Sequence, residues 1–326
     1  MFFNDLKIPL TPLAGPIPAW HTRIDLAQLA AVCRAASAQG GRLAALWGND
    51  DVQGFSLHAV LANDDGALWL TCPLDATQPR IPDLTQWFAC ADRQQRSLRD
   101  LLGIEIEAAA ADADRRPWLR HAAWRETQFP LRRDSHLANT DPLGNEDYAF
   151  VRVEGEGVHE IPVGPVHAGI IEPGHFRFSV VGEKVLRLEE HLGYKHKGID
   201  KLFSSLDLKQ GMRLAARVSG DSTVAYSWAY AMAVETLTAS TPPARALWLR
   251  ALYLERERLA NHLGDLGYLG NDGGLAFGLA QFMRLKEDVL RLNARLAGHR
   301  YLMDLVIPGG VMRDIERSAL EEFATQ

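Results

Sequence analysis

The stretch PPARALWLRALYLERERLANHLGDLGYL, residues 242–269, predicts one long helix and decides the class of the second half of the chain. Two prolines stand near its start, where a helix tolerates them. Its leucines recur at helical spacing, which predicts one apolar face with the charges on another; they are Leu249, Leu252, Leu259, Leu263 and Leu266. Residues 224–237 and 279–298 show the same pattern, so long helices are predicted to dominate after residue 198.

Before this helical part the pattern is mostly that of strands. Strand-like runs occupy 42–48, 54–62, 148–155, 159–164, 175–182 and 184–190, with a turn signal at 63–66. A helix is predicted over 25–36 after the cap Asp25, and another over 85–103 with Gly103 as its stop. The predicted fold class is α+β: a small mixed α/β domain, then a domain with a β-rich start and a long-helix bundle.

Composition divides the chain into three parts. Residues 1–106 are predicted as the first α+β domain, 107–147 as a linker or extended arm, and 148–326 as the second domain. The middle part is rich in Asp, Arg, Pro and Gly. It fits either a solvated loop or an arm that wraps a neighbouring subunit.

The overall composition excludes several classes of function. A net charge of −6 argues against nucleic acid as a partner, because that job needs a basic face. The three cysteines, Cys33, Cys72 and Cys90, fit a reducing compartment and are too few to hold an iron–sulfur cluster. The start is not a signal peptide, and the most apolar run, 225–234, is about half as long as a membrane span. Any membrane association is therefore expected to be peripheral, through partners.

The residues that could carry chemistry gather in polar turns. The sequence has no dinucleotide-binding G-x-G-x-x-G after a strand, no P-loop, no H-E-x-x-H and no G-x-S-x-G. The run GPVHAGIIEPGHFRF, 164–178, instead brings His167, Glu172, His175 and Arg177 among glycines and prolines. There they could exchange protons or bind a polar head group. The alternative is a hairpin whose histidines cap backbone groups.

Three further residues, His191, His196 and Asp272, could have either a structural or a functional role. His191 and His196 are five residues apart and would not share a helix face, so a metal site from this pair is not expected. Asp272 is predicted in a glycine-rich turn after the long helix, where an aspartate is usually a cap. If it lay buried near Glu172 or a histidine, it would become a functional candidate.

The stretch RVSGDSTVAYS, 217–227, has the spacing of a C-x-x-C metal turn, with serine at both ligand positions. Taken alone, Ser219 and Ser222 are expected to cap the helix that follows.

The order of these motifs resembles that of a known family. The chain is similar to the large subunit of group 4 membrane-bound nickel–iron hydrogenases, of the formate hydrogenlyase and hydrogenase 4 type, and to the homologous quinone-site subunit of respiratory complex I. The resemblance covers about residues 160–315 and rests on GPVHAGIIEPGHFRF, GYKHKGIDKL, RVSGDSTVAYS, AVETL, RALYLERERLANHL and GHRYLMDLVIPGGVMRDI. Residues 80–107 and FPLRRD, 129–134, resemble the accessory subunit of complex I, which implies its fusion ahead of the large-subunit domain.

The resemblance implies that the nickel ligands are lost. In the hydrogenases this turn reads R-V-C-G-I-C, and both cysteines bind the nickel–iron centre. Here Ser219 and Ser222 replace them, Asp221 replaces the apolar residue, and no cysteine follows Cys90. Serine hydroxyls are poor nickel ligands, so no metal is expected on this chain. The second cysteine pair of the family would lie beyond Gln326, so the C-terminal part of that domain is expected to be missing.

The resemblance also implies roles for single residues. Glu172 resembles the hydrogenase glutamate that relays protons, and it stands at or near the quinone-site histidine of complex I. Asp272 matches the aspartate that pairs with that histidine. Lys197 stands where complex I has an arginine beside the terminal iron–sulfur cluster, and Leu302 replaces a histidine near that cluster. The quinone-head tyrosine of complex I falls in the 217–222 turn, which has none, and Tyr226 is not given its role.

Together these roles imply a subunit of a complex I-like or hydrogenase-related membrane oxidoreductase. Electrons would pass from an iron–sulfur small subunit to a quinone-like or unknown acceptor, coupled to proton or ion movement. Glu172, His167, His175 and Asp272 would form the proton-handling shell. The residues expected near the acceptor or the cluster are Lys197, Arg217, His196, Ser219, Asp221 and Ser222.

The implied setting is the cytoplasmic face of the inner membrane, where the chain would be peripheral. Its partners would be the iron–sulfur subunit and antiporter-like and other membrane subunits. No cofactor is expected on this chain, a quinone would be the acceptor, and NAD would be used only by the whole complex. The rival hypothesis is a redox-silent structural subunit that docks the iron–sulfur subunit onto the membrane module. A third, an active nickel–iron hydrogenase, predicts stoichiometric nickel.

Overall fold

The computed structural model describes residues 6, 8–15, 17–107, 114–120, 124–135, 150–167 and 172–325. The chain divides into two compact units. The first comprises Met1–Leu13 and Ile17–Lys201, and the second comprises Ala14–Pro16 and Leu202–Gln326. The mixture of sheets and helices confirms the predicted α+β class. Among the described residues, no helix combines the length and the apolar character that crossing a membrane requires.

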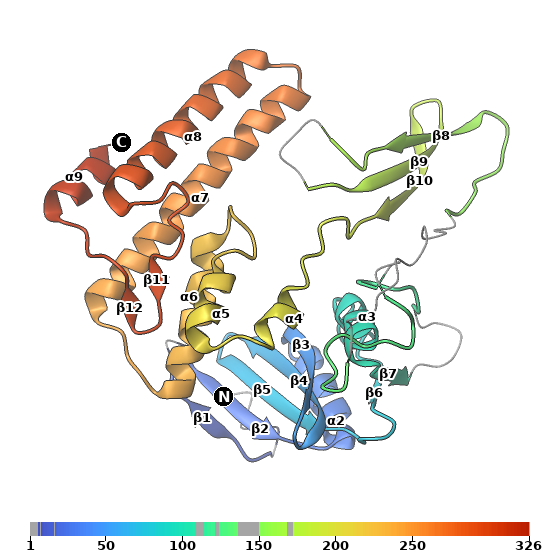
Figure 1. Ribbon diagram of the computed structural model, residues 1–326. Helices are drawn as coiled ribbons and strands as arrows, with labels where there is room; N and C mark the ends of the chain where they lie inside the picture. The colour runs from blue at the N-terminus through green and yellow to red at the C-terminus, as the bar shows by residue number, and fades with distance from the viewer. Residues whose placement is uncertain are drawn as a thin grey trace. The chain divides into compact units, whose positions relative to one another are not determined.

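The first unit begins with a five-stranded sheet in the order β1-β2-β5-β4-β3 (Figure 1). Strand β2 runs parallel to β5, and the other neighbours are antiparallel. The turn signal at 63–66 is confirmed as the connection between β4 and β5. The strands are β1 Thr11–Leu13, β2 Ala19–Arg23, β3 Arg42–Asp51, β4 Gly54–Asn63 and β5 Gly66–Pro73.

Two helices share a buried core with this sheet. Helix α2, Leu26–Ala38, begins as predicted at Asp25, whose side chain accepts a 2.7 Å hydrogen bond from the backbone N–H of Gln28. Helix α3, Ala91–Leu102, ends as predicted at the left-handed Gly103. The fully buried side chains of this core include Leu29, Leu57, Leu61, Leu68, Leu70, Leu84, Leu102 and Ile104.

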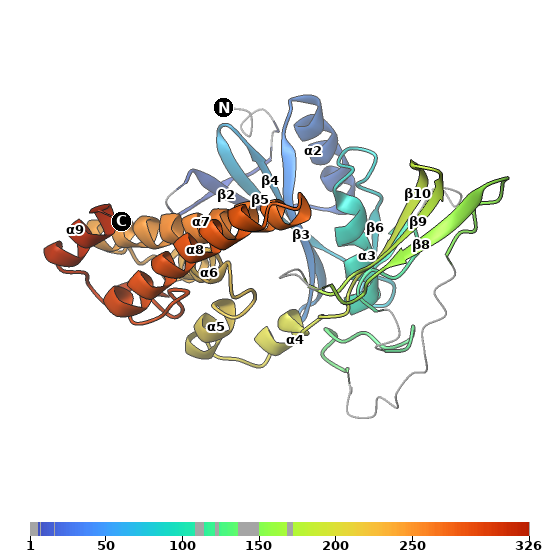
Figure 2. The same ribbon diagram turned by 90° about the horizontal axis from the view of Figure 1, so that it is seen from above.

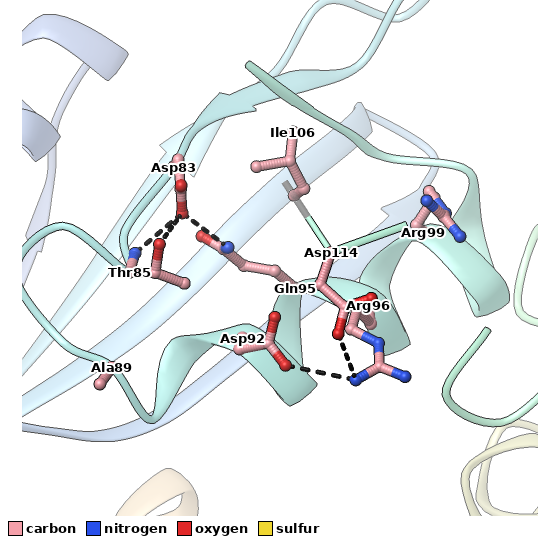
Figure 3. A pocket seen from close by; sticks show the side chains of 9 residues that line it. All are labelled: Asp83, Thr85, Ala89, Asp92, Gln95, Arg96, Arg99, Ile106 and Asp114. Carbon is pink, nitrogen blue, oxygen red and sulfur yellow. Dashed lines mark hydrogen bonds and ion pairs between the residues drawn. The ribbon is translucent and has the colours of Figure 1, made fainter. Parts of the chain in front are cut away.

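Helix α3 begins later than the predicted residue 85, and Asp83 is the reason. Its carboxylate accepts hydrogen bonds from the backbone N–H and the hydroxyl of Thr85, at 2.9 and 2.7 Å, and from the Gln95 amide at 3.0 Å (Figure 3). The Gln95 carbonyl in turn accepts from the N–H of Leu84 at 2.7 Å. These local bonds favour a turn over a helix at 83–85.

The described part of the predicted linker lies against α3 of its own unit. The buried carboxylate of Asp100 accepts three consecutive backbone N–H groups, those of Trp118, Leu119 and Arg120, at 2.7, 2.8 and 3.1 Å. On the outer side of α3, Arg96 lies between Asp92 and Asp114 at 3.3 and 3.2 Å, beside a small cavity of about 240 Å³ (Figure 3). Short strands β6, Arg80–Pro82, and β7, Glu105–Glu107, pair before this segment. The rest of 107–147 lies outside the described residues.

A second sheet of the first unit has three antiparallel strands: β8 Val158–Val163, β9 His175–Val181 and β10 Lys184–His191. Side chains alternate between its faces. His175 and Arg177 of β9 lie on the same face as their partners on β10, His191 and Glu189. Phe176 and Phe178 of β9 lie on the opposite face. The strand predicted over 148–155 is wrong for 150–155, which form none, and 148–149 lie outside the described residues.

The second unit is largely helical, as predicted. Helices α7 and α8 lie side by side in both views and are joined by a short turn (Figures 1 and 2). A small hairpin of β11, Val306–Ile307, and β12, Gly310–Val311, interrupts the helices. The helices are α4 Ile199–Phe203, at the boundary of the two units, α5 Leu208–Ala215, α6 Thr223–Thr238, α7 Ala244–Asp272, α8 Ala276–Ala297 and α9 Arg317–Thr325.

The buried face of α7 differs from the predicted leucine stripe. Leu259 and Leu266 are each 45% exposed, so the prediction is wrong for these two. Three charged residues, Arg250, Arg256 and Glu257, are buried instead. Burial of charge is tolerated only with hydrogen-bond partners, and each of the three has them.

Arg250 and Glu235 form an ion pair inside this unit, with Arg250 fully buried and Glu235 8% exposed. Two guanidinium nitrogens of Arg250 donate to the two carboxylate oxygens of Glu235, at 3.2 and 2.5 Å. Arg250 also donates to the carbonyls of Ile307 and Gly310, at 2.7 and 3.1 Å, and Glu235 accepts from the N–H of Gly309 at 2.7 Å. The pair therefore joins α6, α7 and the β11–β12 hairpin.

Candidate functional site

The 217–222 turn connects α5 and α6 in the second unit. The Ser219 hydroxyl donates to the carboxylate of Asp221, and the N–H of Ser222 donates to the carbonyl of Ser219 at 3.3 Å. Ser222 directly precedes α6, yet its side chain makes no capping hydrogen bond. The prediction that Ser219 and Ser222 cap this helix is therefore wrong.

Glu257 of α7 caps α6 in place of the serines. Its two carboxylate oxygens accept from the N–H groups of Val224 and Ala225, at 2.6 and 3.2 Å. Loss of water around this carboxylate raises its pKa, the two N–H groups act in the opposite direction, and Asp221 adds a further increase. One turn later on α7, the Asn261 amide donates to the carbonyl of Asp221 at 2.7 Å.

Arg217, at the start of the turn, is paired with Asp304. The two groups form a bidentate contact with distances of 2.7 and 2.8 Å, and Arg217 also donates to the carbonyl of Arg213 at 2.7 Å. The Arg217 guanidinium lowers the pKa of Asp304 below its ordinary value, and Asp304 raises the pKa of Arg217. The positive charge predicted to face an acceptor is thus balanced within the unit.

This pair predicts a pH dependence. A carboxylate whose pKa is lowered by folding stabilises the folded chain above its unfolded pKa, and the contribution is lost as the pH falls through the folded pKa. For Asp304 that loss begins below the ordinary value of 3.8. The Asp304→Asn variant is expected to lose less stability than the wild type as the pH falls from about 5 to 3, measured by urea unfolding at each pH. Asp288→Asn, which removes an exposed charge on α8, is the control; equal pH slopes for wild type and Asp304→Asn would contradict the prediction.

The second predicted cluster, His167, Glu172 and His175, lies in the first unit around the β8–β9 connection. His167 Nε2 is 2.8 Å from the carbonyl oxygen of Gly174, and His175 Nδ1 is 3.3 Å from that of Gly164. Both contacts agree with the hairpin alternative, in which histidines bond backbone groups. His175 Nε2 is buried without a hydrogen-bond partner among the described residues, beside the Phe150 ring at 5.2 Å. Glu172 is exposed.

The remaining candidates lie apart from these groups along the chain. His196 is exposed, and its ring lies 6.2 Å from that of Trp124 in the same unit. Lys197 is also exposed. Asp272 is the last residue of α7 and not part of the turn after it, which corrects the predicted position, and it is exposed. Within α7 it lies far from Glu257 and Asn261, so the turn and Asp272 do not meet directly.

Sequence reasoning missed Glu257, Asn261 and Asp304. A signal for Glu257 exists, because it continues the helical spacing of the small and apolar residues Leu249, Tyr253, Ala260 and Gly264 on the buried face. No local pattern marks Asp304, which pairs across 87 positions of sequence. Among the described residues, no three His, Cys, Asp or Glu side chains are grouped as metal ligands.

The sequence is similar to subunits of hydrogenases and of NADH-quinone oxidoreductases. Residues 21–141 match the family model described as the respiratory-chain NADH dehydrogenase, 30 Kd subunit. Formate hydrogenlyase subunit 5 of Escherichia coli (strain K12) is 33% identical over 288 residues, which are 85% of this chain and 50% of that protein. The chain is related to subunits of membrane-bound hydrogenases and of complex I.

Two further relatives match about half of the chain. The membrane-bound hydrogenase subunit alpha of Pyrococcus furiosus is 33% identical over 156 residues, 48% of this chain and 36% of the relative. An NADH-quinone oxidoreductase subunit of Granulibacter bethesdensis is 29% identical over 166 residues, 51% of this chain and 42% of the relative. The chain thus spans half or less of the length of these relatives. The relationship predicted from the motifs is confirmed, while the loss of nickel and the domain fusion stay predictions.

Proposed function

We propose that the chain is an oxidoreductase subunit of a complex I-like or hydrogenase-related membrane complex. It would pass electrons from an adjacent iron–sulfur subunit to a quinone-like acceptor, without a nickel–iron centre. The observation that carries the proposal is the 217–222 turn. It keeps its place in a motif order shared with the family, while the Ser219 and Ser222 hydroxyls stand where the family has thiolates and Asp221 stands where it has an apolar residue.

The donor set of this turn does not fit nickel. The Ser219 and Ser222 hydroxyls and the Asp221 carboxylate are hard oxygen donors, and nickel in this family needs soft thiolates. A hydroxyl donor suits a quinone better, because the carbonyl oxygens of a quinone accept hydrogen bonds. Ser222 supports this use, since its hydroxyl is not spent on capping α6.

Reduction of a quinone to a hydroquinone consumes two electrons and two protons. In the proposal the electrons come from the partner's cluster, and Glu172 and Asp272 pass the protons from solvent. Both carboxylates are exposed, which suits exchange with water. His167 and His175 would orient the loop that carries Glu172, and Lys197 and His196 would lie towards the cluster.

The setting is proposed from the relatives. One relative is by name a membrane-bound hydrogenase subunit, and another is by name an NADH-quinone oxidoreductase subunit. The chain would be peripheral, on the cytoplasmic face of the inner membrane, beside an iron–sulfur small subunit and antiporter-like membrane subunits. NAD would be used at the level of the complex.

The rival is a redox-silent docking subunit. The observation that favours it is the internal bonding of the turn: Ser219 bonds Asp221, Asn261 bonds the backbone of Asp221, and Asp304 holds Arg217. A turn satisfied in this way can serve as structure alone.

Turnover of the purified complex tests the proposal. Glu172→Gln and Asp272→Asn are each expected to lower quinone reduction by about 100-fold, the lower end of the range for a lost proton-transfer group. The measurement is reduction of a short-chain quinone, together with reoxidation of the partner's iron–sulfur cluster followed by its spectrum.

Matched controls lie close by in the chain. Glu183→Gln, in the β9–β10 turn, and Asp265→Asn, on an exposed face of α7, change the charge equally and are expected to leave turnover unchanged. Full activity in both Glu172→Gln and Asp272→Asn would remove their proposed roles. A cluster that no quinone reoxidises would establish the docking rival, and stoichiometric nickel in the complex would establish the hydrogenase.

A further inference from the structure

Glu257 occupies a place that usually binds anions. The first N–H groups of a helix have no partner within the helix and carry the positive end of its dipole, so they attract phosphate or carboxylate groups. In α6, which has 16 residues, the protein's own Glu257 fills this place through Val224 and Ala225. The carboxylate comes from another helix, more than 30 positions later in the sequence.

Capping α6 with Glu257 costs more free energy than capping it with Ser222 would, because Glu257 is a buried charged group. A serine at the N-cap would satisfy one of these two N–H groups without burying a charge. Glu257 is instead 9% exposed, and burial raises its pKa. The arrangement leaves the Ser222 hydroxyl out of the cap, in the turn itself.

Helix α7 holds the turn at a second point. Asn261 stands four residues after Glu257, on the same side of α7, and donates to the carbonyl of Asp221. Glu257 and Asn261 thus fix both ends of the segment from Asp221 to Ala225. Helix α7 thus holds the end of the turn that leads into α6, in addition to the Ser219–Asp221 hydrogen bond within the turn.

The charges around the turn have a consequence for its ligand. Arg217 is balanced by Asp304, which leaves Asp221 and Glu257 as the negative groups next to the helix start. An anion approaching the turn would meet two carboxylates, and the N–H groups that could bind it are already taken.

We propose that Glu257 is a positioning and specificity residue, which holds the 217–222 turn and closes the start of α6 to anions. The turn therefore admits an uncharged electron acceptor and rejects phosphorylated or carboxylated ones. The inferred ligand class rests on the proposed function, because that function places the electron acceptor at the 217–222 turn. The anion closure is a property of this chain alone.

Thermal unfolding of the full chain tests the closure without any electron transfer. Wild type, Glu257→Ala and Glu255→Ala are compared in sodium chloride and in sodium phosphate of equal ionic strength at neutral pH. Glu255 is the matched control, because it lies on α7 but is exposed and pairs with Arg258 at the surface. Glu257→Ala is expected to melt about 4 °C below Glu255→Ala, since the buried N–H of Val224 and the partly buried N–H of Ala225 lose their partner.

Phosphate distinguishes a specific role from a merely structural one. It is expected to raise the melting temperature of Glu257→Ala by about 2 °C more than that of wild type, because it enters the vacated helix start. Glu257→Gln keeps one amide oxygen as an acceptor, so its phosphate effect is expected to lie between those of wild type and Glu257→Ala. This variant replaces Glu257→Ala in the comparison if the alanine variant does not fold. Equal melting of the alanine variants removes the positioning role, and an equal phosphate effect in all proteins removes the anion closure.

The assembled complex tests the ligand class. Glu257→Ala is expected to raise the KM for an uncharged quinone about tenfold, to change kcat less, and to make turnover sensitive to inorganic phosphate. If no quinone is reduced by the wild-type complex while the melting results are as expected, the proposed function fails and the anion closure stands. If the quinone is reduced but phosphate has no selective effect on Glu257→Ala in either assay, the inference fails and the proposed function stands.

Discussion

Replacement of Arg250 by methionine is expected to lower the free energy of unfolding by about 3–5 kcal/mol, the usual cost of leaving one member of a buried ion pair alone. Glu235 would keep only the N–H of Gly309 as a partner, and the carbonyls of Ile307 and Gly310 would lose their donor. Urea unfolding of the full chain, followed by circular dichroism, measures the change. A loss of less than about 1 kcal/mol would contradict the inference that this pair holds α6, α7 and the β11–β12 hairpin together.

Two comparisons separate the ion pair from general effects. Arg258→Met removes an exposed arginine from the same helix and is expected to cost at most about 1 kcal/mol. The double variant Arg250→Met/Glu235→Leu removes both charges, so it is expected to be more stable than Arg250→Met alone. It should not recover wild-type stability, because the hairpin groups at 307–310 remain without partners.

The second large effect is expected in the first unit at Asp100. The N–H groups of Trp118, Leu119 and Arg120 all donate to one carboxylate oxygen of Asp100, and in asparagine a neutral amide oxygen would take its place. We expect a loss of about 2 kcal/mol, because three hydrogen bonds to a buried charged acceptor become weaker bonds to a neutral one. The 114–135 segment should also become open to proteases before global unfolding, which limited proteolysis with mass spectrometry measures.

Asp92→Asn is the control for Asp100→Asn. Asp92 lies on the same helix and pairs with Arg96 at the surface, with 37% of its side chain exposed. It is expected to cost about 0.5 kcal/mol. Similar stability and similar cleavage of the two variants would mean that Asp100 does not fasten the segment.

Much of the fold could be predicted because local patterns decide it. The caps at Asp25 and Gly103, the turn at 63–66 and the long helix before Asp272 each follow from a few neighbouring residues. The start of α3 could not be predicted in this way. There Asp83 and Gln95, twelve positions apart, bond across a turn that reads as helix by spacing alone.

The candidate site shows the same division. The spacing of Ser219 and Ser222 marks the turn, and the motif order marks its family. The capping role expected of the serines is taken by Glu257, which lies in another helix, and the charge of Arg217 is balanced by a distant aspartate. Both contacts depend on how the helices pack, and no pattern within ten residues of the turn specifies them.

The continuous helix α7 also fixes the distance that a proton would travel from Asp272 to the turn. Eleven residues separate Asn261, at the turn, from Asp272, at the end of the helix, which is about 16 Å at 1.5 Å per residue. No proton crosses that distance in a single hydrogen-bonded step. If Asp272 supplies protons to an acceptor at the turn, it must do so through a relay of several carriers, and the length of that relay is set by the helix and does not vary with the side chains at its two ends.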